Sequence, residues 1–89
     1  MPTVHLVVSG KVQGVYYRSS AKEAAEVLQI KGTVRNNRLG QVEIIASGSS
    51  EQIEHFINWC YIGPPAARVR EVGITELEEM GFTEFSILR

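Results

Sequence analysis

The sequence contains no aspartate, because all ten of its acidic residues are glutamate. This absence excludes an aspartyl-phosphate intermediate and the aspartates that commonly hold Mg²⁺ in phosphoryl-transfer sites. His5 has no second histidine, cysteine or carboxylate beside it at the spacing of a metal site. We therefore expect any phosphate chemistry in this chain to proceed without a metal ion or other cofactor.

Cysteine and long apolar runs are also scarce. Cys60 is the single cysteine, so an internal disulfide is excluded and a reducing compartment is favoured. No apolar run is long enough to span a bilayer, and the segment Met1–His5 lacks the basic and apolar regions of a targeting signal. These features predict a soluble, cytoplasmic protein with no membrane partner.

A strong net charge is absent as well. The formal charge of −1 provides no basic field of the kind that nucleic-acid binders use, so no nucleic-acid partner is expected. The charges are unevenly distributed: residues 1–45 carry six basic and three acidic side chains, and residues 46–89 carry three basic and seven acidic ones. An anionic ligand is expected on the first half, although an uneven solvated surface without function is the alternative.

The length and average composition predict one domain over residues 1–89 with a single core. Alternating apolar residues predict five strands, at residues 3–9, 31–36, 41–46, 67–77 and 82–88. Helical spacing predicts one helix from about residue 19 to about 29 and another from 49 to 63. Each helix begins at a capping-box signature, with Ser20 and Ser49 as the caps.

Several details of these elements can also be predicted. The second helix should end at Gly63 because two prolines follow, and Cys60 should be a small core residue within it. Val69 and Val72 are out of phase in the fourth strand, which predicts a bulge or an edge position. The order β-α-β-β-α-β, with a short C-terminal strand, predicts an α+β ferredoxin-like sandwich, in which an antiparallel sheet carries two helices on one face.

The stretch from Gly10 to Arg18 connects the first strand to the first helix and reads Gly-Lys-Val-Gln-Gly-Val-Tyr-Tyr-Arg. Backbone amides gather at a helix N-terminus, where the helix dipole is positive, and the planar guanidinium of Arg18 adds five donors. These groups suit a phosphate. The alternative is a glycine-containing turn followed by a surface arginine.

Two stretches resemble the signatures of the acylphosphatase family. Val8–Arg18 is similar to the first signature, aliphatic-x-Gly-x-Val-Gln-Gly-Val-x-Phe/Met-Arg. Gly32–Gly48 is similar to the second, which begins Gly-aromatic-Val-basic-Asn-x-x-x-Gly-x-Val. Tyr17 stands where phenylalanine is usual, and Thr33 stands where an aromatic residue is usual. We expect the small Thr33 to leave a looser contact under Asn36.

The resemblance implies an enzyme, an acylphosphatase that hydrolyses the carboxyl-phosphate bond of small-molecule acyl phosphates to a carboxylate and inorganic phosphate. It implies two catalytic residues: Arg18 would clamp the phosphoryl group, and Asn36 would position the attacking water. It also implies a phosphate-binding loop made of Lys11, Val12, Gln13, Gly14, Val15, Tyr16, Tyr17 and Arg18. No metal or cofactor is implied, and the physiological acyl group is open.

Two other functions are open at this point. An RNA-binding module of the same fold would need aromatic residues on its central strands, and Gln41–Ala46 carries none. A catalytically weak acylphosphatase-like module that binds phosphate or another anion is the second alternative, which the presence of Arg18 and Asn36 disfavours. A monomer is expected, because no apolar stripe is left over once both helices pack on the sheet.

Overall fold

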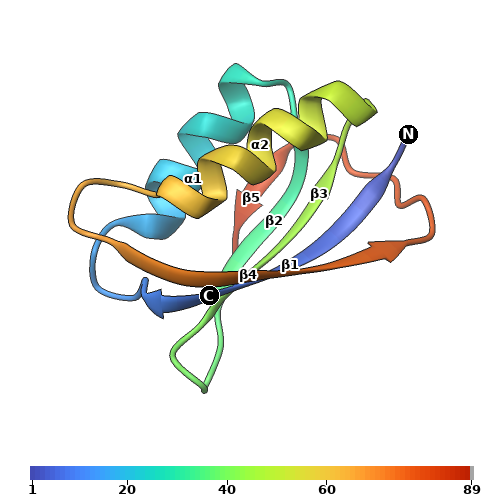
Figure 1. Ribbon diagram of the computed structural model, residues 1–89. Helices are drawn as coiled ribbons and strands as arrows, with labels where there is room; N and C mark the ends of the chain where they lie inside the picture. Colours follow the sequence, from blue (N-terminus) through green and yellow to red (C-terminus); the bar gives the residue numbers. More distant parts are fainter. Residues whose placement is uncertain (89) are drawn as a thin grey trace.

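The computed structural model describes residues 1–88, which form a five-stranded sheet with two helices on one face (Figure 1). The helices are α1 (Tyr17–Val27) and α2 (Ser50–Ile62). The strands are β1 (Thr3–Lys11), β2 (Lys31–Asn36), β3 (Val42–Ser47), β4 (Arg68–Leu77) and β5 (Phe85–Ile87), and they lie in the order β4-β1-β3-β2-β5. The predicted ferredoxin-like sandwich is confirmed.

One pairing departs from the antiparallel sheet expected from the sequence. The β1–β3, β1–β4 and β2–β3 pairs are antiparallel, but β5 runs parallel to β2, with Phe85 opposite Gly32. The reason lies in where β4 ends: Leu77 is level with Thr3, at the end of the sheet where β2 begins. The chain crosses to the far edge at that end, so β5 must run in the same direction as β2.

The core lies between the sheet and the helices. β1 points Val4, Leu6 and Val8 into it, as its alternating pattern predicts. The helices contribute the buried side chains Tyr17, Ala21 and Ala25 from α1 and Ile53, Phe56 and Cys60 from α2. The small alanines let α1 lie close to the sheet. Neither helix described in residues 1–88 has the length and apolar character needed to cross a bilayer.

The start of α1 corrects a prediction: Ser20 is not the cap. The residue at the N-cap position is Tyr16, whose backbone is left-handed (φ 65°, ψ 24°), and no side chain caps the helix. The Ser20 amide donates to the Tyr16 carbonyl oxygen at 3.1 Å, which places Ser20 within the first turn. The packing of the fully buried Tyr17 determines where the helix begins, and a buried aromatic outweighs a serine cap.

The start of α2 confirms the other predicted capping box. The Ser49 hydroxyl accepts from the Gln52 amide at 3.2 Å, and the Gln52 side chain accepts from the Ser49 amide at 2.8 Å. Gly63 ends the helix with a positive φ of 65°, a conformation that favours glycine.

β4 confirms the predicted irregularity in its pattern. It lies at the edge of the sheet, and its register against β1 shifts between Ser9 and Gly10. Beyond this bulge the pairing continues to Lys11, so β1 is two residues longer than its alternation predicts. Gly10 and Lys11 consequently belong to the strand, and the connection to α1 begins at Val12.

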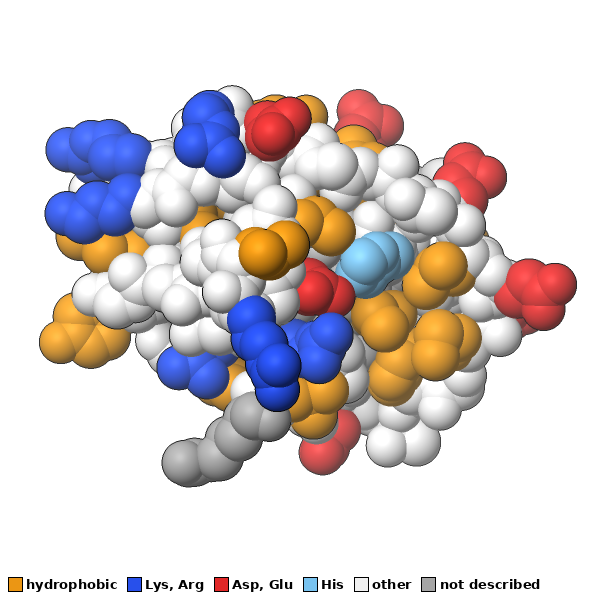
Figure 2. All heavy atoms as spheres, turned by 90° about the horizontal axis from the view of Figure 1, so that it is seen from below, with side chains coloured by type: hydrophobic (Ala, Val, Ile, Leu, Met, Phe, Trp, Pro, Cys, Tyr) orange, Lys and Arg blue, Asp and Glu red, His pale blue; other side chains and the backbone are white. Residues whose placement is uncertain are grey.

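The sheet face opposite the helices is open, with hydrophobic side chains around a histidine and an acidic side chain (Figure 2). Thr33 lies on this face, where it lines a hollow together with His5, Arg35 and Glu43. Side chains alternate along a strand, so Thr33 and Asn36 point to opposite faces. The expected contact of Thr33 under Asn36 is therefore wrong.

Candidate active site

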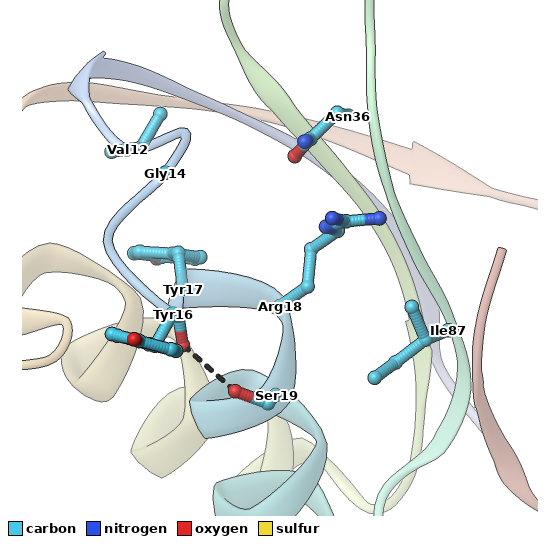
Figure 3. A pocket seen from close by; sticks show the side chains of 8 residues that line it. All are labelled: Val12, Gly14, Tyr16, Tyr17, Arg18, Ser19, Asn36 and Ile87. Atoms are coloured by element: carbon cyan, nitrogen blue, oxygen red, sulfur yellow. Dashed lines mark hydrogen bonds between the residues drawn. The ribbon is translucent and has the colours of Figure 1, made fainter. Parts of the chain in front are cut away.

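A cavity of about 480 Å³ lies between the N-terminal end of α1 and the C-terminal end of β2. Figure 3 shows the side chains of Arg18, from α1, and Asn36, from β2, pointing into it. Its lining consists of Val12, Gly14, Tyr16, Tyr17, Arg18, Ser19, Asn36 and Ile87. Arg18 is the one charged side chain among these lining residues, so the electrostatic potential of the cavity suits an anion.

The N-terminal end of α1 presents its amide groups without a side-chain cap and without an acidic residue in its first turn. Gly14 (φ 75°) and Tyr16 (φ 65°) bend the preceding loop through left-handed backbone conformations. Such a conformation costs a non-glycine residue on the order of 1–3 kcal/mol, and strain of this kind is concentrated at binding and catalytic sites. Uncapped amides and the positive end of the helix dipole are features that suit an anion.

Arg18 is half-buried and forms no ion pair with any carboxylate in residues 1–88. The N–H donors of its guanidinium are therefore available to a ligand. A guanidinium can bind two oxygens of a phosphoryl group with parallel hydrogen bonds, which a lysine cannot do.

Asn36 carries the one buried side-chain oxygen or nitrogen atom that has no hydrogen-bond partner within residues 1–88, its Oδ1. A buried acceptor without a donor costs roughly 1–3 kcal/mol. Since the side chain lines the cavity, a donor group there, such as a water molecule or a ligand hydroxyl, is the candidate partner of this atom.

The cavity lining offers no conventional base. Carboxylate and histidine side chains are absent from the lining residues within 1–88. Burial raises the pKa of the Tyr17 phenol far above its usual range, and Cys60 adds to this effect, so the phenol stays protonated. The described part of the chain also contains no group of three His, Cys, Asp or Glu side chains that could hold a metal ion.

The structure brings together six of the residues predicted for the site. Val12, Gly14, Tyr16, Tyr17, Arg18 and Asn36 all line the cavity. Three other residues of the predicted phosphate loop do not line it. Lys11 is exposed at the end of β1, Val15 is buried in the core, and Gln13 donates hydrogen bonds to the turn between β2 and β3.

Two lining residues were missed by the sequence reasoning. Ser19 directly follows Arg18. A prediction that started α1 at Tyr17 would have placed Ser19 in the first turn, beside the cavity. Ile87 reaches the cavity because β5 pairs with β2, and no local pattern near Ile87 signals that neighbour.

Fold and cavity together define a small α+β protein with a cavity at a helix N-terminus whose groups suit an anion. The sequence model of the acylphosphatase family matches residues 4–87. The chain is 46% identical to an acylphosphatase from Methylococcus capsulatus over 90 residues, which cover 100% of this chain and 98% of that protein. This chain therefore belongs to the acylphosphatase family, and it is an enzyme of that family.

Solved structures agree with this assignment. The crystal structure of an acylphosphatase from Bacillus subtilis is similar over 100% of both chains, with a TM-score of 0.97 and 31% identity. HypF from T. kodakarensis is similar over 98% of this chain but only 12% of its own, with a TM-score of 0.83 and 35% identity. The same unit therefore also occurs as a small part of a much larger protein.

Proposed function

We propose that this chain hydrolyses the carboxyl-phosphate bond of small acyl phosphates in the cavity between α1 and β2. Membership of the acylphosphatase family supports the reaction class. The observation that carries the proposal is the meeting of an uncapped helix N-terminus, the unpaired Arg18 and the unsatisfied Oδ1 of Asn36 in one cavity. The first two groups suit a phosphoryl group, and the third suits a nucleophilic water.

In this scheme Arg18 binds two phosphoryl oxygens, and amides of the loop and the first turn of α1 bind the phosphoryl group as well. Charge spread over these oxygens in the transition state is stabilised by donors that are already in place. No metal ion takes part. The acyl group extends from the cavity toward solvent, past the exposed ring of Tyr16.

Asn36 accepts a hydrogen bond from the attacking water through Oδ1 and so directs an oxygen lone pair at phosphorus. The bond from water oxygen to phosphorus forms as the bond from phosphorus to the carboxyl oxygen breaks, and the carboxylate leaves with the bonding electrons. Its low pKa makes a general acid unnecessary. The proton of the water passes to a phosphoryl oxygen, because neither Asn36 nor the protonated Tyr17 can accept it.

The test is phosphate release from benzoyl phosphate in the presence of EDTA. Asn36→Ala should lower kcat by roughly 10²–10³, by comparison with other preorganised donors and acceptors, and Arg18→Ala by at least as much. Arg38→Ala and Asn58→Ala are matched controls, because both residues are exposed and outside the cavity lining. Full activity of Asn36→Ala, or loss of native activity with EDTA, would contradict the mechanism.

A module that binds phosphate without turnover is the second candidate, favoured by the likeness to a small part of HypF. It predicts a native chain that releases no phosphate from benzoyl phosphate but whose unfolding temperature rises with inorganic phosphate. Arg18→Ala should remove that rise. The monomeric state and the cytoplasmic location expected from the sequence stay predictions.

A further inference from the structure

The side chain of Gln13 does not line the cavity, although Gln13 lies within the loop that forms one wall. Its Nε2 donates to the carbonyl oxygen of Asn37 at 3.0 Å and to the carbonyl oxygen of Gln41 at 2.9 Å. Both donor hydrogens of the amide are therefore used, and Gln13 is not among the lining residues. It is half-buried between the loop and the turn that joins β2 to β3.

The two acceptors are the ends of that turn, and the first of them directly follows Asn36. The turn has its own internal hydrogen bonds, because Asn37 Oδ1 accepts from the amides of Leu39 and Gln41 at 3.0 Å each. A shift of the loop relative to Asn37 would thus be a shift relative to Asn36. Gln13 therefore connects the loop before α1 to Asn37, which is the neighbour of Asn36 and its unsatisfied Oδ1.

The sheet does not provide this connection. The ladder between β1 and β3 ends at Val8 and Val42, before the loop begins. None of the backbone hydrogen bonds described in residues 1–88 joins positions 12–16 to positions 37–41. One further side-chain bond spans the gap from the end of β1, since Gln41 Nε2 donates to the buried Ser9 Oγ at 3.0 Å. The direct tie to the loop is the amide of Gln13.

We propose that Gln13 is a positioning residue for the reaction, and that it sets the placement of the bound phosphoryl group relative to the water on Asn36. This inference rests on the proposed function. In-line attack requires the reacting atoms at near-contact distance, and a displacement of about 1 Å can cost on the order of 10² in rate. Gln13 would act through the loop and the turn without touching the substrate.

The first experiment separates turnover from phosphate binding. Gln13→Ala should lower kcat for benzoyl phosphate roughly 10- to 100-fold. The inhibition constant of inorganic phosphate should change by less than about 3-fold, because Arg18 and the α1 amides stay in place. A kcat that stays within about 2-fold of the native value, or an inhibition constant that rises as much as kcat falls, would overturn the proposal.

Gln13→Glu supplies a readout that packing alone would not change. The glutamate side chain has the same length, but its carboxylate has no hydrogen to donate and faces two carbonyl oxygens. When protonated it regains one O–H donor. The activity of Gln13→Glu relative to Gln13→Ala should therefore rise as the pH is lowered from about 7 to about 5, where more of this carboxyl is protonated. An activity ratio that does not change with pH would contradict the role of the two hydrogen bonds donated by Gln13.

A double-mutant cycle tests whether the effect passes through Asn36. In the Asn36→Ala background the water is no longer held, so Gln13→Ala should lower kcat by less than about 3-fold. An equal loss in both backgrounds would overturn the positioning role. Gln52→Ala is the matched control, because it removes a side-chain hydrogen bond at the start of α2, the end of that helix far from the α1 loop (Figure 1). It should lower thermal stability and leave kcat unchanged.

The outcomes also separate this inference from the function on which it rests. A native chain without activity would remove the proposed function. A native chain that loses activity through Arg18→Ala and Asn36→Ala, but not through Gln13→Ala, would leave the function standing and remove the role of Gln13. Should Gln13→Ala fail to fold, the kcat of Gln13→Glu and its inhibition constant for inorganic phosphate at about pH 7 are compared with those of the native chain instead.

Discussion

The hydroxyl of Tyr17 donates a 2.7 Å hydrogen bond to the carbonyl oxygen of Cys60, and it thereby joins the start of α1 to the end of α2. The ring also packs against Trp59, with the ring centroids 5.3 Å apart. A buried phenol needs such a partner, and the carbonyl at the end of a helix lacks one within its own helix. A tyrosine is therefore accommodated at the position where the first signature has phenylalanine or methionine.

Tyr17→Phe should lower the free energy of unfolding by about 1 kcal/mol, because it removes this hydrogen bond while keeping the ring. Urea unfolding followed by fluorescence measures the change. Tyr61→Phe is the control, since Tyr61 is exposed, and it should have no measurable effect. Equal effects of the two substitutions would show that the buried bond does not contribute to stability.

Cys60 should be unreactive in the folded protein. Its side chain is fully buried, and burial raises the pKa of the thiol to about 12, so almost no thiolate exists at about pH 8. A thiol reagent such as DTNB should detect no sulfhydryl in the native protein and one per chain in denaturing urea. Rapid labelling of the native protein at about pH 8 would contradict the burial of Cys60.

Glu43 should make stability depend on pH. Its carboxylate is 20% exposed and accepts from Asn37 Nδ2 at 2.9 Å, and this bond, followed by those from His5 and Arg35, lowers the pKa of Glu43 below its usual value. A lowered folded-state pKa stabilises the fold above the unfolded-state pKa of about 4.3, and this contribution is lost as the pH falls through the folded-state pKa.

Glu43→Gln removes that dependence. Between about pH 6 and about pH 3 the free energy of unfolding should fall more steeply in the native chain than in Glu43→Gln. Urea titrations at a series of pH values measure the difference. Glu54→Gln alters an exposed carboxyl on α2 and should follow the native curve. Parallel curves for the native chain and Glu43→Gln would refute the role of this carboxylate.

Gly32 has a structural reason to be glycine. Its φ is +146°, and a Cβ at this position would lie 1.8 Å from the carbonyl oxygen of Ile45. Gly32→Ala should therefore destabilise the protein by at least about 2 kcal/mol through backbone strain and overpacking. Gly81→Ala is the matched control: no atom lies within 4 Å of its added Cβ, so the change should stay within about 0.5 kcal/mol. Thermal unfolding of both variants provides the comparison.

Local patterns predicted most of the secondary structure. The bounds of β2, Lys31–Asn36, agree with its alternation, and the capping box at Ser49 places the start of α2. These signals lie within a few residues of the feature that they predict. The capping signature at Ser20 gave a wrong helix start because it is a local signal. The competing contact, from Tyr17 to Cys60, joins residues that are far apart in the chain.

Local patterns in the amino-acid sequence specify the order of helices and strands, the alternation that buries one face of the sheet, and the positions of Arg18 and Asn36 next to element ends. The parallel placement of β5 beside β2 and the position of Ile87 at the cavity depend on the folded chain as a whole. The tie from Gln13 to the β2–β3 turn likewise appears only in the folded chain. Periodicity and capping act over a few residues, whereas strand partners and contacts between distant segments depend on how the whole core packs.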